Sequence, residues 1–315
     1  MTYNFVTVFN SLYLPQALAL HSSLKKFSIN FKLWAICIDN ESYQFIKKLC
    51  DKSIEAVDFS TYENKELLKL KKGRSVAEYC WTITPITPKI IFKINKKINS
   101  VTYVDADMFF LNNPKILINK FLKSNKQVLF TNHDFNSKDK FKEKIFGKFC
   151  VQFMTFKKNG SEKIRNIWEK KCLNWCFAIP NKGRMGDQKY LDNIYKNFKN
   201  KIFVAPNDLF SATWNYEKIN YKKIIAWHFH GFKIINKRLF LMHHLKYLPK
   251  NIKEKIYIPY MHSINRSIKK TMFNKSQFKN NKNIYLILKN IIKFKLIEFG
   301  IFKKDRYWNT ISKNN

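Results

Sequence analysis

The chain has 315 residues, of which 45% are hydrophobic and 16% aromatic, so it can bury a large core and is not a disordered protein. Glycine and proline are scarce, with 7 and 8 residues, which excludes collagen-like and linker-type sequences. No apolar stretch approaches the roughly 20 residues that a membrane-spanning helix needs. Residues 1–8 lack the basic segment typical of a secretion signal, so we expect a cytoplasmic protein.

The chain is strongly basic, since 59 Lys and Arg against 22 Asp and Glu give a formal net charge of +37. Only 6 of the basic residues are arginine, and asparagine is abundant at 34, which is the composition that an AT-rich genome produces. Arginine makes the bidentate contacts by which proteins read bases, so this composition argues against a nucleic-acid partner. A positive surface still favours anionic partners such as nucleotides, phosphates or lipid headgroups.

The first part of the chain alternates apolar runs with amphipathic ones. Its expected elements are strands at 3–9, 32–38 and 54–59 and helices from Pro15 and over 41–51. This β-α-β-α-β order predicts an α/β fold with a doubly wound, mostly parallel sheet. Such sheets bind ligands at the carboxyl ends of their strands, so Asn10 and Tyr13, just after the first strand, are candidates to face a ligand.

The same alternation continues along the chain. Further strands are expected at 101–104, 127–131, 150–157 and 224–227, and helices at 63–72, 75–85, 88–97 and 161–177. The composition then changes. Residues 246–315 hold 17 basic and 3 acidic residues, against 42 and 19 in residues 1–245. We therefore divide the chain into a main domain at 1–245 and a basic, mainly helical region at 246–315.

The six cysteines are not expected to form a disulfide framework, because no secretion signal accompanies them. Cys172 and Cys176 lie on one face of an expected helix. They form either half of a zinc site or a pair of small buried hydrophobic residues. A zinc site would need two more ligands at suitable spacing, so burial is the favoured interpretation.

The sharpest motif is Asp105-Ala106-Asp107, which directly follows the apolar strand at 101–104. Carboxylates are costly to bury, so two of them at the end of a buried strand need a partner. Two carboxylates two residues apart straddle a turn and can hold Mg²⁺ or Mn²⁺, which also takes phosphate oxygens. A polar turn without a metal is the alternative, since a lone D-x-D is common.

A second motif, His228-Phe229-His230-Gly231-Phe232-Lys233, follows the strand expected at 224–227. An imidazole is a suitable third metal ligand beside two carboxylates, Gly231 lets the backbone approach a diphosphate, and Lys233 supplies a point charge. Two structural histidines at a strand end are the alternative. In the third motif, Gly186-Asp187-Gln188, Asp187 can cap the next helix, which leaves Gln188 free to face a substrate.

The order of these motifs resembles that of the GT-A-fold nucleotide-sugar glycosyltransferases, specifically those like glycosyltransferase family 8. The resemblance spans about residues 3–235 and is carried by 10–14, 78–85, 103–107, 168–192, 214–215 and 228–231. It implies a Rossmann-like, mixed and mostly parallel sheet flanked by helices. It also implies an enzyme that moves a sugar from a nucleotide-diphosphate donor to a cell-surface glycan or glycolipid, with retention of configuration.

The resemblance assigns roles to individual residues. It implies that Mn²⁺ or Mg²⁺ is held by Asp105, Asp107 and His228, with His230 as a rival for the third place. Gln188 and Asp187 would flank the anomeric carbon, and Asp187 would be the base if the enzyme inverts. The nucleotide sugar would be bound by Thr7, Phe9, Asn10, Tyr13, Arg74, Asp105, Gly231 and Lys233. Here the lysine follows Gly231 one residue sooner than in family 8.

Residues 283–304 read as a cationic, broadly apolar helix. Such a helix either lies on an anionic bilayer surface, beside a lipid-linked acceptor, or docks on the main domain. The first reading places the protein on the inner face of the cytoplasmic membrane. The alternatives to a transferase are a basic protein that binds nucleic acid or membrane surfaces without catalysis, a non-catalytic member of the fold, and a nucleotidyltransferase.

Overall fold

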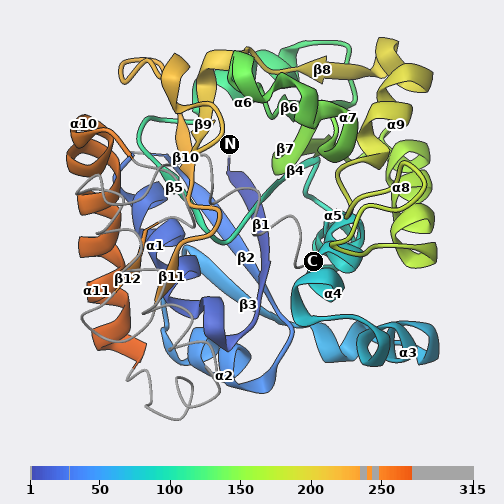
Figure 1. Cartoon of the computed structure of the whole chain (residues 1–315). Coiled ribbons are helices and arrows are strands. Elements are labelled where there is room, and N and C mark those ends of the chain that lie inside the picture. Colours follow the sequence, from blue (N-terminus) through green and yellow to red (C-terminus); the bar gives the residue numbers. More distant parts are fainter. Residues whose placement is uncertain (1, 28, 235–239, 243–247, 272–315) are drawn as a thin grey trace.

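A seven-stranded mixed sheet organises the computed structural model, which describes residues 2–27, 29–234, 240–242 and 248–271 (Figure 1). Its strand order is β3-β2-β1-β4-β7-β6-β8. The strands are β1 Tyr3–Phe9, β2 Phe31–Cys37, β3 Ile54–Asp58, β4 Ser100–Val104, β6 Val128–Asn132, β7 Phe149–Lys157 and β8 Ile202–Val204. All pairs are parallel except those of β7, which runs antiparallel to β4 and β6. The expected mixed, mostly parallel sheet is thereby confirmed.

Helices cover both faces of this sheet because the buried strands are apolar on both sides. In β1, Phe5 and Phe9 belong to one core cluster and Val6 and Val8 to another, as strand alternation requires. The first face is covered by α1 Leu14–Lys25, α2 Asn40–Lys48 and α6 Lys115–Lys123. The second is covered by α3 Lys65–Gly73, α4 Val76–Ile83, α5 Thr87–Ile94, α8 Glu162–Asn174 and α9 Tyr190–Phe198. Cys172 and Cys176 are free and fully buried on the second face, which confirms their reading as small hydrophobic residues.

A small second sheet is formed by β5 Met108–Phe110, β10 Ala226–His228 and β9 Phe210–Ala212. The strand expected at 224–227 is observed at 226–228, and β5 and β9 were not expected from the sequence. Each of these strands is three residues long, which is too short for periodicity to reveal. A two-stranded hairpin of β11 Lys233–Ile234 and β12 Phe240–Leu241 follows.

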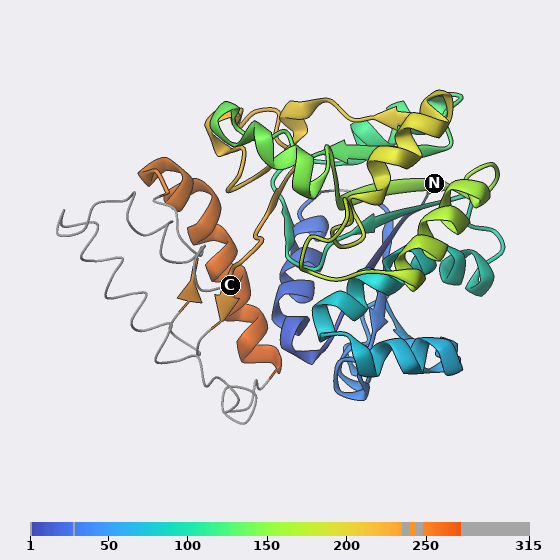
Figure 2. The ribbon, with the colours of Figure 1, turned by 45° about the vertical axis from the view of Figure 1, so that its right-hand side comes forward.

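The described residues beyond 245 pack on the main domain. They are α10 Lys250–Ile252, a π-helical turn Lys253–Tyr257 and α11 Ile258–Thr271, which lies along α1 (Figure 2). Tyr260 of α11 stacks on Phe229, with ring centroids 3.6 Å apart, inside a third core cluster. The expected helix at 283–304 lies outside the described residues. No helix in the described part combines the length and the apolarity that crossing a bilayer requires.

Candidate active site

The two aspartates stand on a tight turn between the large and the small sheet. The Asp105 amide donates to the Gln152 carbonyl of β7 (3.1 Å), and the Met108 amide donates to the Asp105 carbonyl (3.1 Å). The chain therefore turns from β4 directly into β5, and both carboxylates stay at the carboxyl end of β4. This is the place where parallel sheets bind ligands.

The register of β10 on β5 brings the histidine motif to this turn. His228 pairs with Met108, and the Phe229 amide donates to the Asp107 carbonyl (3.0 Å). The His228 Nε2 atom lies 3.1 Å from Asp107 Oδ1 and 3.7 Å from Asp105 Oδ2. One donor atom from each of the three residues lies within 4.8 Å of the other two. Backbone pairing thus brings two motifs that are far apart in the sequence into one cluster.

The charges in this cluster are strongly coupled. Burial raises the pKa of Asp105, and the neighbouring Asp107 raises it further, while His228 opposes both effects. Burial opposes the ionisation of Asp107 too, but the charge and hydrogen bond of His228 lower its pKa overall. Burial alone would lower the pKa of His228, yet the two carboxylates raise it well above its usual value. Two carboxylates this close repel each other unless a cation lies between them.

These residues fit a divalent cation. Two carboxylates and an imidazole are a donor set that Mn²⁺ accepts readily and that leaves positions for water or phosphate oxygens. Tyr103 donates to Asp105 Oδ1 (2.8 Å), so the other oxygen, Oδ2, is the one that faces His228. His230 is exposed, its ring centroid lies 5.7 Å from that of His228, and it is not part of the three-residue cluster.

Gln152, which the sequence did not single out, orients the His228 ring. The His228 Nδ1 atom lies 3.2 Å from Gln152 Oε1, and because this oxygen can only accept, Nδ1 carries a proton and Nε2 faces the carboxylates. Gln152 is 1% exposed on the otherwise apolar strand β7. A buried amide in a strand of hydrophobic residues was the available signal, because such a group needs a polar partner.

The Asp187 and Gln188 pair lies near the cluster. Burial raises the pKa of Asp187 well above its usual value, and the next cause is the charge of Asp105, so the two carboxyl groups are close enough to interact. The helix that follows, α9, begins only at Tyr190 with Lys189 at its N-cap position. The expected capping role of Asp187 is therefore wrong. Gln188 is less buried than Asp187 and lies near His133.

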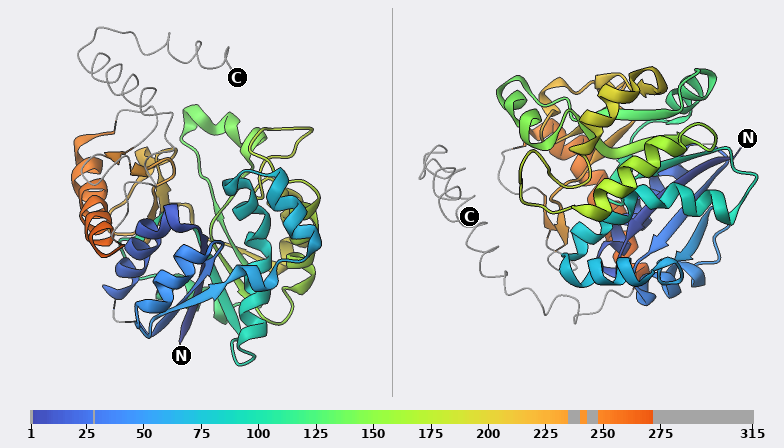
Figure 3. Two further views of the ribbon diagram at one scale, coloured as in Figure 1. Left: turned by 90° about the horizontal axis from the view of Figure 1, so that it is seen from below. Right: turned by 90° about the vertical axis from the view of Figure 1, so that its right-hand side faces the viewer.

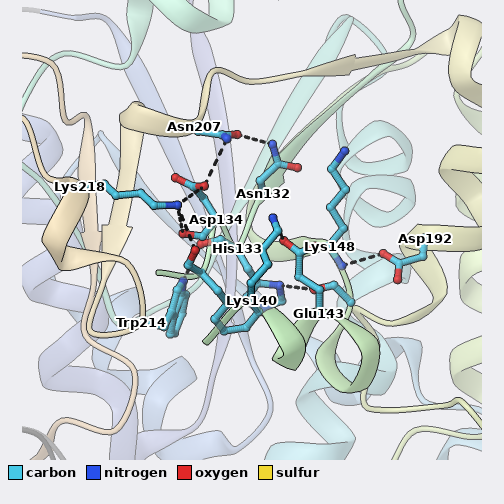
Figure 4. A network of polar contacts seen from close by, with 12 residues as sticks. Asn132, His133, Asp134, Lys140, Glu143, Lys148, Asp192, Asn207, Trp214 and Lys218 are labelled. Carbon is cyan, nitrogen blue, oxygen red and sulfur yellow. Dashed lines mark hydrogen bonds and ion pairs between the residues drawn. The ribbon is translucent and has the colours of Figure 1, made fainter. Parts of the chain in front are cut away.

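His133 and Trp214 pack against each other (Figure 4), a contact that the sequence did not predict. Trp214 Nε1 donates to the His133 carbonyl (2.8 Å), and the Trp214 ring contacts His133, His228 and His230, with centroids 5.4–5.9 Å apart. His133 Nδ1 lies 2.9 Å from the Gly147 carbonyl, and burial lowers the pKa of this histidine to about 3. A neutral ring results, held between the loop after β6 and the loop after β9.

The residues expected to bind the nucleotide lie at the end of β1. The side chains of Thr7 and Phe9 are 0% and 1% exposed, so only the backbone of this strand end is available to a ligand. Asn10 is half-buried and its carbonyl accepts from the Tyr13 amide (2.9 Å). Desolvation raises the pKa of Tyr13, and the charge of Asp107 raises it further, which places its hydroxyl near the cluster. Asp39, which was not predicted, accepts from the Ser11 amide at this edge (2.8 Å).

Gly231 and Lys233 follow the histidines on a turn that leads into β11. Gly231 has a φ of +81°, a conformation that residues other than glycine rarely adopt, and the Phe232 amide donates to the Phe229 carbonyl (2.9 Å). Lys233 is exposed. Its role at a phosphate stays a prediction.

Arg74 binds backbone carbonyls at the end of α8 and not the residues of the cluster. Its guanidinium donates to the carbonyls of Cys172 (2.9 Å) and Leu173 (2.8 Å) and to the hydroxyl of Thr82. These two carbonyls belong to the last turn of α8, where helix carbonyls lack partners within the helix. The buried guanidinium therefore caps a helix, and the described contacts give no support to the expected sugar-binding role of Arg74.

Comparison with known proteins agrees with this architecture. No model of a protein family matches the chain. Solved structures that resemble it include mouse xyloside xylosyltransferase 1 in its apo form (TM-score 0.50, 13% identity, 72% of this chain and 97% of that one). Another is the bifunctional glycosyltransferase WbbM (TM-score 0.53, 12% identity, 86% of this chain and 51% of that one). The chain therefore has the GT-A fold of glycosyltransferases, as the resemblance implied.

Two curated relatives come from Bacillus subtilis (strain 168), and both are uncharacterized proteins. YfnF is 28% identical over 255 residues, which cover 75% of this chain and 84% of YfnF. YfnD is 24% identical over 288 residues, which cover 85% of this chain and 90% of YfnD. This chain therefore spans most of the length of both relatives.

Proposed function

We propose that this chain is a metal-dependent glycosyltransferase that uses a nucleotide-diphosphate sugar. The observation that carries the proposal is the cluster of Asp105, Asp107 and His228 at the carboxyl end of β4, within a GT-A fold. A nucleoside diphosphate is a poor leaving group until its developing charge is offset. A bound Mn²⁺ or Mg²⁺ supplies that offset as a Lewis acid.

The chain's own residues then bind and orient the donor. The three cluster residues hold the cation, and Lys233 and the backbone at Gly231 meet the diphosphate. The backbone from Thr7 to Asn10 and the Tyr13 side chain hold the nucleoside end. This arrangement follows the order of the strands, because β1 and β4 are neighbours in the sheet and both end at this edge.

We further propose that the reaction proceeds with retention and that Gln188 flanks the anomeric centre. Transfer passes through a state with oxocarbenium-ion character, which an amide oxygen stabilises without acting as a base. Asp187 is 5% exposed, whereas Gln188 is more accessible beside His133. The proposed acceptor is a cell-surface glycan or a lipid-linked sugar.

A thermal-shift panel tests the donor and the cation together. Nucleoside diphosphates and nucleotide sugars are added singly with Mn²⁺, Mg²⁺ or EDTA to the wild type, Asp107→Asn and Asp208→Asn. Asp208 is the matched control, because it pairs with Lys223 (3.1 Å) outside the cluster. A ligand whose free concentration is 100 times its dissociation constant raises the free energy of unfolding by about 2.7 kcal/mol.

Stabilisation by one nucleotide that needs the metal and is lost only in Asp107→Asn supports the proposal. A folded protein that no nucleotide stabilises contradicts it. A salt-dependent shift of DNA by such a protein would then favour the alternative of a basic binding protein.

A further inference from the structure

A short helical segment beside the site exposes apolar side chains that the fold does not use. It consists of η4 Ser137–Lys142, followed without a break by α7 Glu143–Phe146, and it buries none of its residues. Phe141 is 61% exposed and Ile145 is 40% exposed. Phe141 stands near the end of η4 and Ile145 in α7, about one helical turn further on, and we call these two side chains the apolar stripe. Keeping such side chains in water costs free energy, which suggests a partner.

The segment is held firmly at both ends. At its start, the Asn136 amide donates to the Trp214 carbonyl (2.9 Å). At its end, Lys189 Nζ donates to the Glu143 carbonyl (2.9 Å), and the Lys148 amide donates to Asp192 Oδ1 (2.9 Å). A side chain on Gly147 would lie 3.3 Å from Asp192 Oδ1, so the chain also approaches α9 closely. These contacts attach both ends of the segment to the rest of the domain, and Figure 4 shows the one between Lys148 and Asp192.

The charge around the stripe is positive. Residues 137–148 contain five lysines and two acidic residues. Both acidic residues pair with lysines of the same segment, Lys140 with Glu143 (2.6 Å) and Lys142 with Asp139 (2.7 Å). Lys138 and Lys144, which flank the stripe, are exposed. We name this surface the Phe141 face and define it as Lys138, Lys140, Phe141, Lys144 and Ile145.

The Phe141 face stands close to the candidate active site. The segment joins the His133 loop at one end, and at the other end the Gly147 carbonyl contacts the His133 ring. The left view of Figure 3 shows the segment projecting from the edge of the ribbon. A partner bound to this face would therefore lie beside the proposed site of sugar transfer.

We infer that the Phe141 face contacts an anionic membrane surface. Phe141 and Ile145 enter the boundary between headgroups and acyl chains, and the exposed Lys138 and Lys144 beside them meet lipid phosphates. The positive charge of the segment is complementary to such a surface, and a stripe of two apolar side chains is smaller than the contact area of a stable protein interface. The inference goes beyond the proposed function, since it places this edge of the molecule at a lipid surface whichever sugar is transferred.

Vesicle co-sedimentation of the full chain tests the inference. The vesicles are phosphatidylcholine alone or phosphatidylcholine with phosphatidylglycerol, in salt near physiological strength. The variant is Phe141→Ser with Ile145→Ser, which removes the apolar stripe and leaves every charge in place. The control is Ile116→Ser, since Ile116 is 78% exposed on α6 and follows Lys115, away from the segment.

We expect the double variant to bind the anionic vesicles about tenfold more weakly than the wild type, and Ile116→Ser to bind as the wild type does. Equal binding of the double variant and the wild type would overturn the inference, as would equal binding of the wild type to both kinds of vesicle. Neither readout requires a nucleotide, so failure of the proposed function would leave this test intact.

Hydrogen exchange on the wild-type chain locates the contact independently of any substitution. Amides of residues 137–148 should exchange more slowly when anionic vesicles are added. Protection elsewhere with none in this segment would overturn the inference, and would assign vesicle binding to another basic part of the chain. This measurement also decides the question if the double variant does not fold.

Discussion

The His228 ring is held between Gln152 and Asp107, with Nδ1 3.2 Å from the Gln152 amide oxygen and Nε2 3.1 Å from the Asp107 carboxylate. The amide determines which nitrogen carries the proton, and so leaves Nε2 to face the two aspartates. A residue on β7 thereby orients the cluster residue His228 on β10. Loss of such an outer contact typically lowers metal affinity by about 10–100-fold.

Separate substitutions of His228 and His230 should show which of the two histidines the metal site needs. His228→Ala removes a cluster member, and we expect metal-dependent binding of nucleotide to fall below detection. His230→Ala should retain the metal requirement, because His230 is exposed and outside the cluster. Calorimetric titration with Mn²⁺ and a nucleoside diphosphate measures both variants. Loss of binding in His230→Ala alone would reverse this assignment.

Gln152→Leu should weaken metal binding while the three ligands remain. Without its amide acceptor His228 loses its preferred orientation, and we expect affinity for Mn²⁺ to drop by about 10–100-fold. Titration of Mn²⁺ by its electron paramagnetic resonance signal reports the affinity directly. Thr155→Val is the control on the same strand, since it removes a buried hydrogen bond to Thr102 (3.0 Å) away from the cluster. An equal loss of affinity in both variants would point to general damage of β7.

Arg74→Gln should destabilise the protein without changing nucleotide affinity. Two carbonyls at the end of α8 would lose a charged donor, at a cost of about 3 kcal/mol. For a chain of 315 residues the melting temperature should fall by roughly 4–5 °C, since the entropy of unfolding is about 2.1 cal/mol/K per residue. Arg184→Gln is the control, since Arg184 is more exposed and lies over Trp175 (4.7 Å). Weaker nucleotide binding by folded Arg74→Gln would restore the donor-binding role that the sequence suggested.

His21 should make the protein less stable in mild acid. Burial lowers the pKa of His21 from 6.5 to about 4, and its Nε2 atom lies 2.8 Å from Ser53 Oγ. The unfolded chain therefore takes up this proton more readily than the folded one. The neutral His21 side chain therefore contributes fully to the free energy of unfolding above pH 6.5. This contribution is lost as the pH falls towards 4, by up to about 1.4 kcal/mol per pH unit.

Urea unfolding at pH 7.5 and pH 5 measures this effect. Between the two conditions the wild type should lose about 2 kcal/mol more than His21→Gln. His262→Gln is the control, because His262 is exposed. The same acid loss in the wild type and His21→Gln would assign the pH dependence to other groups.

Much of the fold could be predicted because its elements are long and periodic. The strands at 3–9, 101–104 and 150–157 are apolar runs bounded by polar residues, and the observed strands differ from them by a residue or so. The small sheet could not be predicted in this way. Its strands β5 and β9 are stabilised by pairing with β10, and a three-residue run has no period of its own.

The sequence by itself determined the fold class, through the alternation of strands and helices. It also pointed to the residues of the candidate metal cluster, because the D-x-D and H-x-H motifs place carboxylates and imidazoles directly after expected strands. Only the tertiary structure decided which histidine joins the aspartates, since that depends on the register of β10 on β5. It also decided that Arg74 caps α8 and that Gln152 and His133 lie at the site. These contacts join residues from different strands and loops, and no local pattern encodes a contact that only packing creates.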